Sequence, residues 1–411
     1  MSEPGAAGVV IVGGGHAGGS AAAFLRQFDY EGAVTVIGEE PIAPYQRPPL
    51  SKAWLKGEAD ADSLALRPES FYAEQHIALR LATRAVSIQR AAKTVTLQGG
   101  ETVAYETLIL ATGARARRLD LPGADLDGVQ VLRSAADAEM LKLALGPGKR
   151  LAVVGGGYIG LEAAASARAL GAEAVVIEAL PRILARSSCE LLSTFFTEYH
   201  KARGVTFELG ATIVGFAGKD GHVTGVKLAD GRVIACDDAV IGIGILPNDE
   251  LARDAGLECS NGIVVDLDAR TSDPSIFAIG DVTQRPLPLY ARTHRLESVA
   301  NALEQARQAA AAIAGHAAPP HEVTWNWSDQ YDIKLQLAGV AFDADELLVR
   351  GDPAKARFAV FHLKGNTIRA VEAINAPAEF MAGKQLIGSQ KPVDRAKLAD
   401  ATVSMKEVAA S

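Results

Sequence analysis

Near its N-terminus the chain reads VVIVGGGHAG over residues 9–18, an apolar run of strand length that ends in the spacing G-x-G-x-x-G. We expect a helix over 19–28 and a second strand over 34–40 that ends in Glu39 and Glu40. In such a unit the three glycines allow a tight turn, a close approach to a pyrophosphate, and packing of helix on strand. Free N–H groups at the helix start then attract phosphate. The stretch therefore predicts a Rossmann-type dinucleotide site. Either acid can accept from a ribose diol, and we favour Glu39.

The same arrangement recurs further along the chain. Residues 151–160 read LAVVGGGYIG, and we expect a helix over 161–170 and a strand over 174–178 that ends in Glu178. The two fingerprints begin at Gly13 and Gly155, 142 residues apart. This spacing is too long for one binding unit, so the sequence predicts two separate Rossmann-like units.

Glu178 bears on the choice of coenzyme in the second unit. A carboxylate at the end of the second strand favours NAD, because it repels the 2′-phosphate of NADP. Arg182 and Arg186 follow closely and keep the NADP alternative open.

A third element distinguishes the two units. Residues 271–281 read TSDPSIFAIGD, the T-x6-A-x-G-D pattern that is typical of two-dinucleotide flavoproteins. Gly280 gives the backbone room beside a ligand, and Asp281 can accept from a ribityl hydroxyl of FAD. The alternative is a strand that ends in an Asp N-cap. The apolar stretches 108–114 and 239–244 both predict the last strand of a dinucleotide unit, where the chain crosses to its neighbour.

Taken together, the motifs resemble one known family. They are YQRPPLSK at 45–52, GGGYIGLE at 155–162, RLESV at 295–299 and WSDQY at 327–331. The whole chain is similar to the FAD- and NADH-dependent ferredoxin reductases of bacterial oxygenase systems, the putidaredoxin reductase-like group of the glutathione-reductase superfamily.

The resemblance implies an α/β fold with two Rossmann-like dinucleotide-binding domains and a smaller α+β C-terminal domain. The FAD domain is expected to be discontinuous, over 1–115 and 251–320, with the NADH domain over 116–250 inserted between. The C-terminal domain is expected over 321–411. Alternation of apolar and polar residues over 333–338 and 358–363 indicates an antiparallel sheet there.

Site residues follow from the same resemblance. Lys52, Glu162 and Trp327 are the expected catalytic residues, with Lys52 and Glu162 close together and a cation near the flavin stabilising its reduced form. Tyr158 is a candidate gate over the flavin. The expected FAD contacts are Gly13, Gly15, His16, Ala17, Gly18, Glu39, Arg47, Lys52, Ala111, Thr112, Gly113, Arg133, Gly280, Asp281, Val299 and Trp327. The expected NADH contacts are Gly155, Gly157, Tyr158, Ile159, Gly160, Glu162, Glu178, Gly244 and Glu297.

The implied reaction is hydride transfer from NADH to FAD, then single-electron transfer to a [2Fe–2S] ferredoxin that feeds a monooxygenase or dioxygenase. Disulfide reductases of the superfamily use cysteines beside the flavin, and the segment 47–52 has none, so a thiol relay is excluded. The alternatives are a rubredoxin reductase, a redox-regulated FAD- and NADH-binding interaction protein, and a flavin reductase for small oxidants.

Bulk properties narrow the partners. The 411 residues suggest two or three domains. A net charge of −8 disfavours nucleic acid as a partner. Three distant cysteines and the absence of a cationic leader or a membrane-length apolar run predict a cytoplasmic protein without a membrane partner. No metal-ligand spacing occurs, so no metal is expected. The sequence does not fix the oligomeric state, for which we expect a monomer or weak homodimer. An acidic ferredoxin would dock on basic residues, for which the candidates are Arg292, Arg295, Arg307, Lys384 and Lys391.

Overall fold

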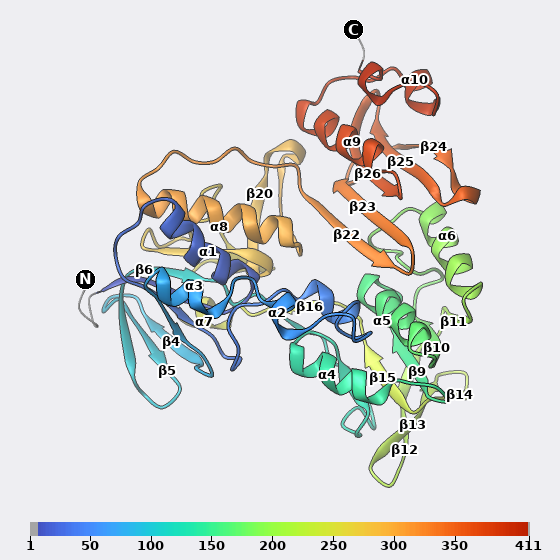
Figure 1. Ribbon diagram of the computed structural model, residues 1–411, viewed down its shortest axis with the longest axis horizontal. Coiled ribbons are helices and arrows are strands. Elements are labelled where there is room, and N and C mark those ends of the chain that lie inside the picture. The colour runs from blue at the N-terminus through green and yellow to red at the C-terminus, as the bar shows by residue number, and fades with distance from the viewer. Residues whose placement is uncertain (1–6, 410–411) are drawn as a thin grey trace.

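In the computed structural model, which describes residues 7–409, the first apolar run forms β1 at the centre of a seven-stranded sheet (Figure 1). Residues 1–6 and 410–411, at the ends of the expected first and third domains, lie outside the described residues. The strand order is β3-β2-β1-β6-β5-β4, with β19 paired to β6. The strands are β1 (Gly8–Val12), β2 (Val34–Ile37), β3 (Ile77–Arg80), β4 (Ala85–Gln89), β5 (Thr94–Leu97), β6 (Thr102–Leu110) and β19 (Ile276–Ala278).

Every residue of β1 is buried, as expected for a central parallel strand that is covered on both faces. Helices α1 (His16–Gln27) and α8 (Val299–Ala314) pack side by side over this sheet. Their contact surface is rich in alanine and glycine, which lets the two helices approach closely. The remaining elements of this first unit are α2 (Ala61–Leu64), α3 (Glu69–Glu74), α7 (Glu250–Asp254), β17 (Cys259–Ser260), β18 (Gly262–Val264), β20 (Thr283–Leu287) and β21 (Arg292–His294).

The second unit is a parallel five-stranded sheet in the order β11-β10-β9-β15-β8. A small antiparallel sheet, β12-β13-β14, lies beside it. The elements are β8 (Val129–Val131), α4 (Ala135–Ala144), β9 (Arg150–Val154), α5 (Tyr158–Ala169), β10 (Glu173–Glu178), α6 (Glu190–Lys201), β11 (Val205–Leu209), β12 (Ile213–Lys219), β13 (His222–Leu228), β14 (Val233–Ala235) and β15 (Asp238–Ile241).

Both fingerprint helices begin three residues earlier than the sequence pattern suggested. α1 starts at His16 rather than residue 19, and α5 starts at Tyr158 rather than residue 161. The reason is that the middle glycine of each fingerprint, Gly15 or Gly157, is the N-cap. A glycine has no side chain with which to cap the first turn, so the N–H groups at each helix start stay free for a ligand.

A two-stranded ribbon joins the two units. β7 (Ala114–Ala116) pairs antiparallel with β16 (Ile245–Pro247), so the two crossings of the chain between the units lie side by side. Asn248 ties this ribbon to β6, because its Nδ2 donates to the Thr112 carbonyl at 2.9 Å while the Thr112 hydroxyl donates to the Asn248 carbonyl at 2.7 Å. The expected crossing strands at 108–114 and 239–244 correspond to the ends of β6 and of β15 (Asp238–Ile241), after which the chain enters this ribbon.

The C-terminal unit is an antiparallel sheet in the order β22-β23-β26-β25-β24, covered by α9. The expected strands at 333–338 and 358–363 are present as β23 and β25. The elements are β22 (Trp325–Gln330), β23 (Ile333–Gly339), β24 (Glu346–Asp352), β25 (Arg357–Lys364), β26 (Thr367–Ile374), α9 (Pro377–Ser389) and α10 (Arg395–Ala399).

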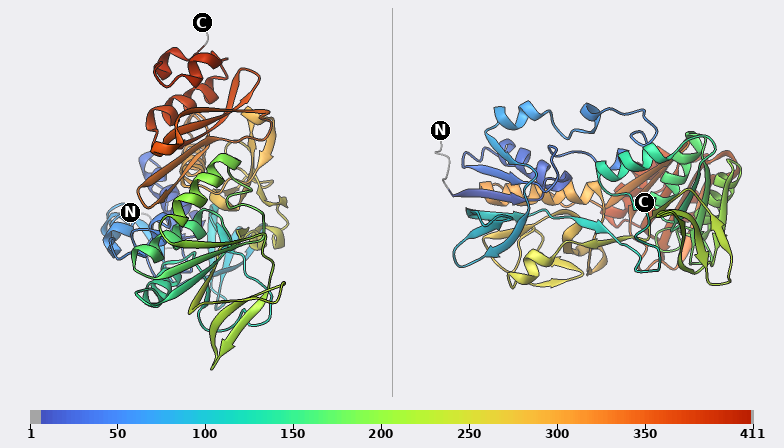
Figure 2. Two further views of the ribbon diagram at one scale, coloured as in Figure 1. Left: turned by 90° about the vertical axis from the view of Figure 1, so that its right-hand side faces the viewer. Right: turned by 90° about the horizontal axis from the view of Figure 1, so that it is seen from below.

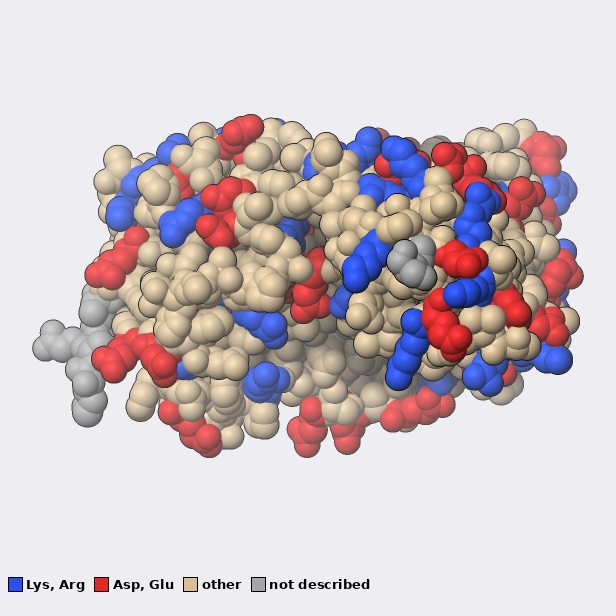
Figure 3. Space-filling view, turned by 90° about the horizontal axis from the view of Figure 1, so that it is seen from above, with Lys and Arg blue, Asp and Glu red and all other residues tan. Residues whose placement is uncertain are grey.

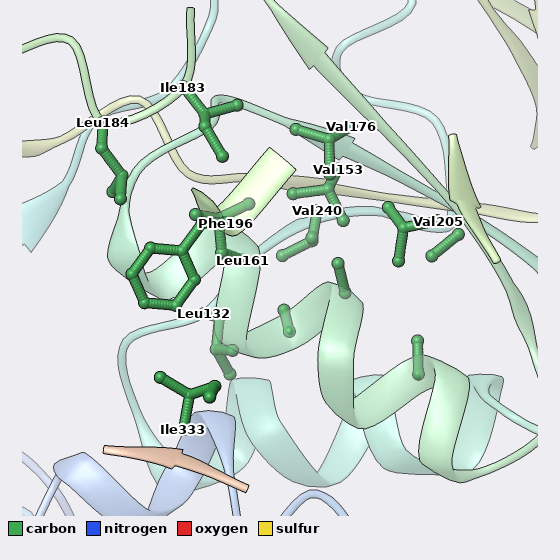
Figure 4. Close-up of a cluster of buried hydrophobic side chains, with 14 of the residues drawn as sticks. Leu132, Val153, Leu161, Val176, Ile183, Leu184, Phe196, Val205, Val240 and Ile333 are labelled. Atoms are coloured by element: carbon green, nitrogen blue, oxygen red, sulfur yellow. The ribbon is translucent and has the colours of Figure 1, made fainter. Parts of the chain in front are cut away.

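One hydrophobic cluster holds the three units together. It is centred on the second unit, with Val153, Leu161 and Phe196, and it continues into Ile333 of β23 (Figure 4). Leu50 of the first unit belongs to the same cluster. Figure 2 shows the result from two further sides, with the C-terminal unit resting against the second unit. A shared core of this kind fixes the relative positions of side chains that come from all three units.

Candidate functional site

The glycines of the first fingerprint differ in what surrounds them. Gly13 has φ +123°, and a Cβ there would lie 2.1 Å from the Ala111 carbonyl oxygen. A Cβ at Gly18 would lie 1.9 Å from the Gly13 carbonyl oxygen. In contrast, a Cβ at Gly15 would meet no atom of the described protein within 4 Å. The fold itself therefore requires the first and third glycines, whereas the middle one faces open space.

The second fingerprint repeats this pattern. Gly155 has φ +107° and its Cβ would lie 2.5 Å from the Gly242 carbonyl oxygen, while a Cβ at Gly160 would lie 2.2 Å from that of Gly155. At Gly157 the nearest described atom would be 4.0 Å away. Open space beside an uncapped helix start is what a pyrophosphate needs, so both turns fit a dinucleotide.

The element at 271–281 meets the first turn. Gly280 has φ +82°, and a Cβ there would lie 3.0 Å from that of Ala17 on α1. Its N–H donates to Gln305 of α8 at 2.8 Å, which fixes the turn against both helices. Close by, the Nδ1 atom of His16 is buried without a hydrogen-bond partner in the described protein. Burial lowers the pKa of His16, so the ring is neutral at neutral pH. Asp281 lies within a 3-10 turn and does not cap a following helix.

Arg133, from the second unit, reaches across to the first site. Its guanidinium pairs with Asp281 at 2.9 Å and also donates to the Ala114 carbonyl at 3.0 Å. The Arg133 carbonyl in turn accepts from Arg47 at 2.8 Å. Three expected FAD contacts that are far apart in the sequence are thereby linked.

The two candidate ribose acids have different surroundings. The Glu39 side chain is 70% exposed and lies 3.6 Å from Arg84. Glu40 instead pairs with Arg47 at 2.6 Å and accepts from the Tyr45 hydroxyl at 2.6 Å. Glu40 therefore belongs to the network of Arg47 and Arg133, while Glu39 faces outward in an exposed pair with Arg84. Ala111, Thr112 and Gly113 follow β6 beside the same turn, with Gly113 close to Arg133.

Glu162 is the point where all three units meet. It lies on α5, is 3% exposed, and its Oε2 pairs with the Lys52 ammonium at 2.7 Å. The same oxygen accepts from the Ser51 hydroxyl at 2.5 Å, and Oε1 accepts from the Ser328 hydroxyl at 2.6 Å. The expected proximity of Lys52 and Glu162 is therefore present, and charge-assisted bonds on both oxygens hold the buried carboxylate in place.

This network extends through the C-terminal unit. Gln330 donates to the Ser328 hydroxyl at 3.1 Å and accepts from Nε2 of the buried His200 at 2.8 Å. Burial lowers the pKa of His200 to about 4, so the ring is neutral and acts as a donor. Trp327 lies between two such positions on β22, so its indole is directed to the opposite face of the strand. There it packs on Trp325 with ring centroids 5.6 Å apart.

In the second site the carboxylate of Glu178 is fixed by the backbone. It accepts from the Gly156 N–H at 2.7 Å and from the Leu180 N–H at 2.8 Å, so it lies directly beside the glycine turn. Tyr158, at the start of α5, bonds the Ser188 hydroxyl at 2.8 Å, and desolvation raises its pKa to about 12. Its neighbour Ile159 is 47% exposed at the same helix end. Gly244, with φ +105°, follows β15.

Glu297 lies near Asp281 and Arg133 of the first site. Its carboxylate pairs with Arg295 at 2.7 Å, and desolvation raises its pKa, with a contribution from the nearby Asp281. Val299 is the first residue of α8. The side chain of Arg295 is only 9% exposed and is paired with Glu297, which disfavours the expectation that it docks a partner. Its long side chain is already paired inside the protein.

The remaining docking candidates differ in their exposure. Arg292, Arg307 and Lys391 are exposed, whereas Lys384 is half-buried and pairs with Glu322 at 3.0 Å. Figure 3 shows one face of the molecule, on which Lys and Arg side chains alternate with Asp and Glu around the C-terminus. A surface hollow of about 880 Å³ between α9 and residues 401–406 lies outside both glycine turns; Lys384 lines it, but none of the expected cofactor contacts does.

Sequence reasoning overlooked several members of the network. Ser51 lies inside the quoted motif at 45–52, and Ser328 and Gln330 lie inside the motif at 327–331, but their contacts with Glu162 depend on the tertiary structure. His200 lies in none of the sequence motifs, so no pattern predicted that it would join this network. A period-2 reading of 327–331 could have placed Ser328 and Gln330 on one buried face.

Comparison with known proteins agrees with this geometry. The model of the pyridine nucleotide-disulphide oxidoreductase family matches residues 7–306, and that of the reductase C-terminal family matches residues 325–409. A probable ferredoxin reductase, CtmF, of Castellaniella defragrans is 50% identical over 402 residues, with 98% of each chain covered. A rubredoxin-NAD(+) reductase of Pseudomonas putida is 42% identical over 369 residues, covering 90% of this chain and 96% of the relative.

Among solved structures, the covalent putidaredoxin reductase–putidaredoxin complex matches with a TM-score of 0.96 and 39% identity, covering 98% of both chains. The α/β fold with two Rossmann-like units and a C-terminal unit is therefore confirmed. Within residues 7–409, no helix combines the length and the apolar character that a membrane crossing requires.

Proposed function

We propose that this chain, which belongs to the pyridine nucleotide-disulphide oxidoreductase family and ends in its reductase C-terminal domain, is an FAD-dependent NADH:ferredoxin oxidoreductase. The observation that carries this proposal is the pair of glycine turns that open on empty space, with the Lys52–Glu162 pair where the units meet. The family uses FAD and a nicotinamide coenzyme, and both turns fit a dinucleotide.

Each cofactor has its own set of residues. In this proposal FAD binds the first unit, over 1–115 and 251–320, where Asp281, Arg133 and the turn at Gly13 would hold it. NADH binds the second unit, over 116–250, at the turn of Gly155 and beside Glu178. The segment 321–411 forms the C-terminal domain. The ion pair between Arg133 and Asp281 supports this division, because Arg133 of the second unit reaches the proposed FAD site of the first unit.

The chemistry at the meeting point depends on Lys52. When bound, FAD would supply the conversion of two-electron hydride chemistry into single electrons, which an iron–sulfur protein requires. Glu162 holds the Lys52 ammonium in a position from which it can stabilise developing negative charge. Trp327, whose ring centroid lies 5.6 Å from that of Trp325, is the expected aromatic contact on the C-terminal side, on the face of β22 opposite Ser328.

The proposed acceptor is a [2Fe–2S] ferredoxin of an oxygenase system. The three cysteines of the chain lie at 189, 236 and 259, outside the segment 47–52, so electrons would leave the flavin without a thiol relay. The name of CtmF and the partner in the putidaredoxin reductase complex support a ferredoxin. We place the protein in the cytoplasm, where NADH is available.

A stopped-flow acceptor panel tests this function. The NADH-reduced holoenzyme should pass electrons rapidly to [2Fe–2S] ferredoxins, and Arg307→Glu should raise the KM for the ferredoxin at low ionic strength. The rubredoxin-NAD(+) reductase relative favours rubredoxin as a second candidate acceptor. Rapid reduction of rubredoxin with no response from any ferredoxin would overturn our assignment in favour of that candidate.

A further inference from the structure

Three buried side chains with metal-binding atoms converge between the second unit and the C-terminal unit. Cys189 is the N-cap residue of α6, whereas His362 lies on β25 and Glu372 on β26. Glu372 faces Val360 across the two strands, so His362 and Glu372 are diagonal neighbours on one face of the sheet. One ligand atom from each of the three residues lies within 4.8 Å of the other two.

The imidazole of His362 is not satisfied by hydrogen bonds within the described protein. The residue is 7% exposed, and its Nε2 is buried without a hydrogen-bond partner. This nitrogen lies 3.5 Å from Oε1 of Glu372 and forms no hydrogen bond with it. A buried ring nitrogen without a partner is costly, and this one is directed at the carboxylate.

Glu372 is also poorly satisfied. The residue is 4% exposed, and the hydrogen bonds found for its carboxylate within residues 7–409 are two long contacts from the Cys189 N–H, at 3.3 and 3.4 Å. An isolated buried carboxylate needs a positive charge or short hydrogen bonds. Among the ion pairs of residues 7–409, Glu372 pairs with no lysine or arginine, and its partner is the His362 imidazole at 3.5 Å. Glu162 instead pairs with the Lys52 ammonium.

We propose that Cys189, His362 and Glu372 form a binding site for a divalent transition metal ion of the zinc type. Thiolate, imidazole and carboxylate are the ligands that zinc takes at bond lengths of roughly 2.0–2.3 Å, with ligand atoms roughly 3.3–3.8 Å apart in a tetrahedron. The 3.5 Å separation of Nε2 and Oε1 matches that spacing. The thiolate and the carboxylate together neutralise the ion, which makes its burial feasible. Water would take the fourth position.

The position of the site indicates what the ion would do. Ser188, next to Cys189, bonds the Tyr158 hydroxyl and accepts from Arg182 at 3.0 Å. The same segment contacts the second glycine turn, because the Leu184 N–H donates to the Gly156 carbonyl at 2.9 Å. The ion would therefore link the C-terminal sheet to the segment that flanks the proposed NADH turn. All three ligands are buried, so it would act on structure and not as a reaction centre.

Zinc binding by the full-length holoenzyme tests the site directly. We expect about one zinc per chain by elemental analysis after equilibration with zinc chloride. Competition with a chromophoric chelator should show an affinity at least about tenfold weaker in Cys189→Ser, His362→Gln and Glu372→Gln. Cys236→Ser is the matched control, because Cys236 is also buried in the second unit but lies outside the cluster. X-ray absorption at the zinc edge should show one sulfur ligand, which Cys189→Ser removes.

Thermal unfolding separates loss of the ion from loss of the fold. A chelator should lower the Tm of the wild-type protein and of Cys236→Ser, and leave that of Cys189→Ser unchanged. Failure of wild-type protein to bind zinc above the level of Cys189→Ser would overturn the proposal. If Cys189→Ser does not fold, the near-isosteric Glu372→Gln decides in the same way. These measurements need neither NADH nor ferredoxin, so the site can fail or stand independently of the proposed function.

Discussion

Ser328 of the C-terminal sheet donates a hydrogen bond of 2.6 Å to the carboxylate of Glu162, which is buried on the second Rossmann unit. Lys52 and Ser51 of the first unit occupy the other oxygen of the same carboxylate. The Glu162 side chain therefore contacts all three units at once, and its contacts depend on how the units are placed relative to one another. A displacement of any unit would leave part of a buried charge without a partner.

Removal of the Ser328 hydroxyl should destabilise the protein. Ser328→Ala leaves Oε1 of the buried Glu162 without its donor, which typically costs about 1–3 kcal/mol. We expect a Tm that is lower by a few degrees in calorimetry. In the double variant Ser328→Ala/Glu162→Gln the two effects should not add, because the residues act as a pair. Additive losses would show that the contact contributes nothing to stability.

Lys52 should control the rate of flavin reduction. Lys52→Met removes the cation held by Glu162, and we expect reduction by NADH to slow by about 10- to 100-fold in stopped flow. Lys56→Met is the control, because Lys56 forms a partly exposed pair with Glu58 on the same segment. Equal slowing in both variants would mean that Lys52 has no special role.

Arg133 should contribute to FAD retention. Arg133→Gln removes the charge that pairs with Asp281. It also disturbs the backbone at residue 133, whose carbonyl accepts a hydrogen bond from Arg47. We expect FAD to bind about tenfold more weakly, measured from the fluorescence of released flavin. Arg150→Gln, which breaks a surface pair with Glu173, should keep its FAD. Unchanged FAD affinity in Arg133→Gln would place the FAD site elsewhere.

Glu178 should determine the coenzyme. The wild-type protein should prefer NADH, because the fixed carboxylate beside the glycine turn repels a 2′-phosphate. Glu178→Gln removes the charge, while the amide oxygen can still accept from the Gly156 N–H. We expect kcat/KM for NADPH to rise about tenfold relative to that for NADH. Equal use of both coenzymes by the wild-type protein would contradict this role.

His200 should make stability depend on pH. Burial lowers its pKa from 6.5 to about 4 in the folded protein, so between these values the unfolded chain binds a proton that the folded chain does not. Its contribution is fully present above pH 6.5 and is lost as the pH falls toward 4, up to roughly 3 kcal/mol. The Tm of wild-type protein should fall more steeply in this window than that of His200→Gln. Parallel curves would show that another group is responsible.

The sequence predicted those parts of the protein whose physics is local. Gly13 is required by the tight turn, and Gly18 is required because the helix that follows packs closely on that turn. The apolar runs around these glycines predict buried parallel strands. Even here, the helix starts differed by three residues, because the capping role of Gly15 depends on backbone geometry. The family resemblance supplied the Lys52–Glu162 pair, which no local pattern contains.

The tertiary structure alone decided the contacts between distant segments. Arg133 with Asp281, Ser328 with Glu162, and the cluster of Cys189, His362 and Glu372 each join residues from different units. No spacing rule encodes these contacts, because their geometry depends on how three separately patterned units pack on one shared core. The two glycine turns were therefore determined by the sequence. How the side chains around them are joined into one site was determined by packing.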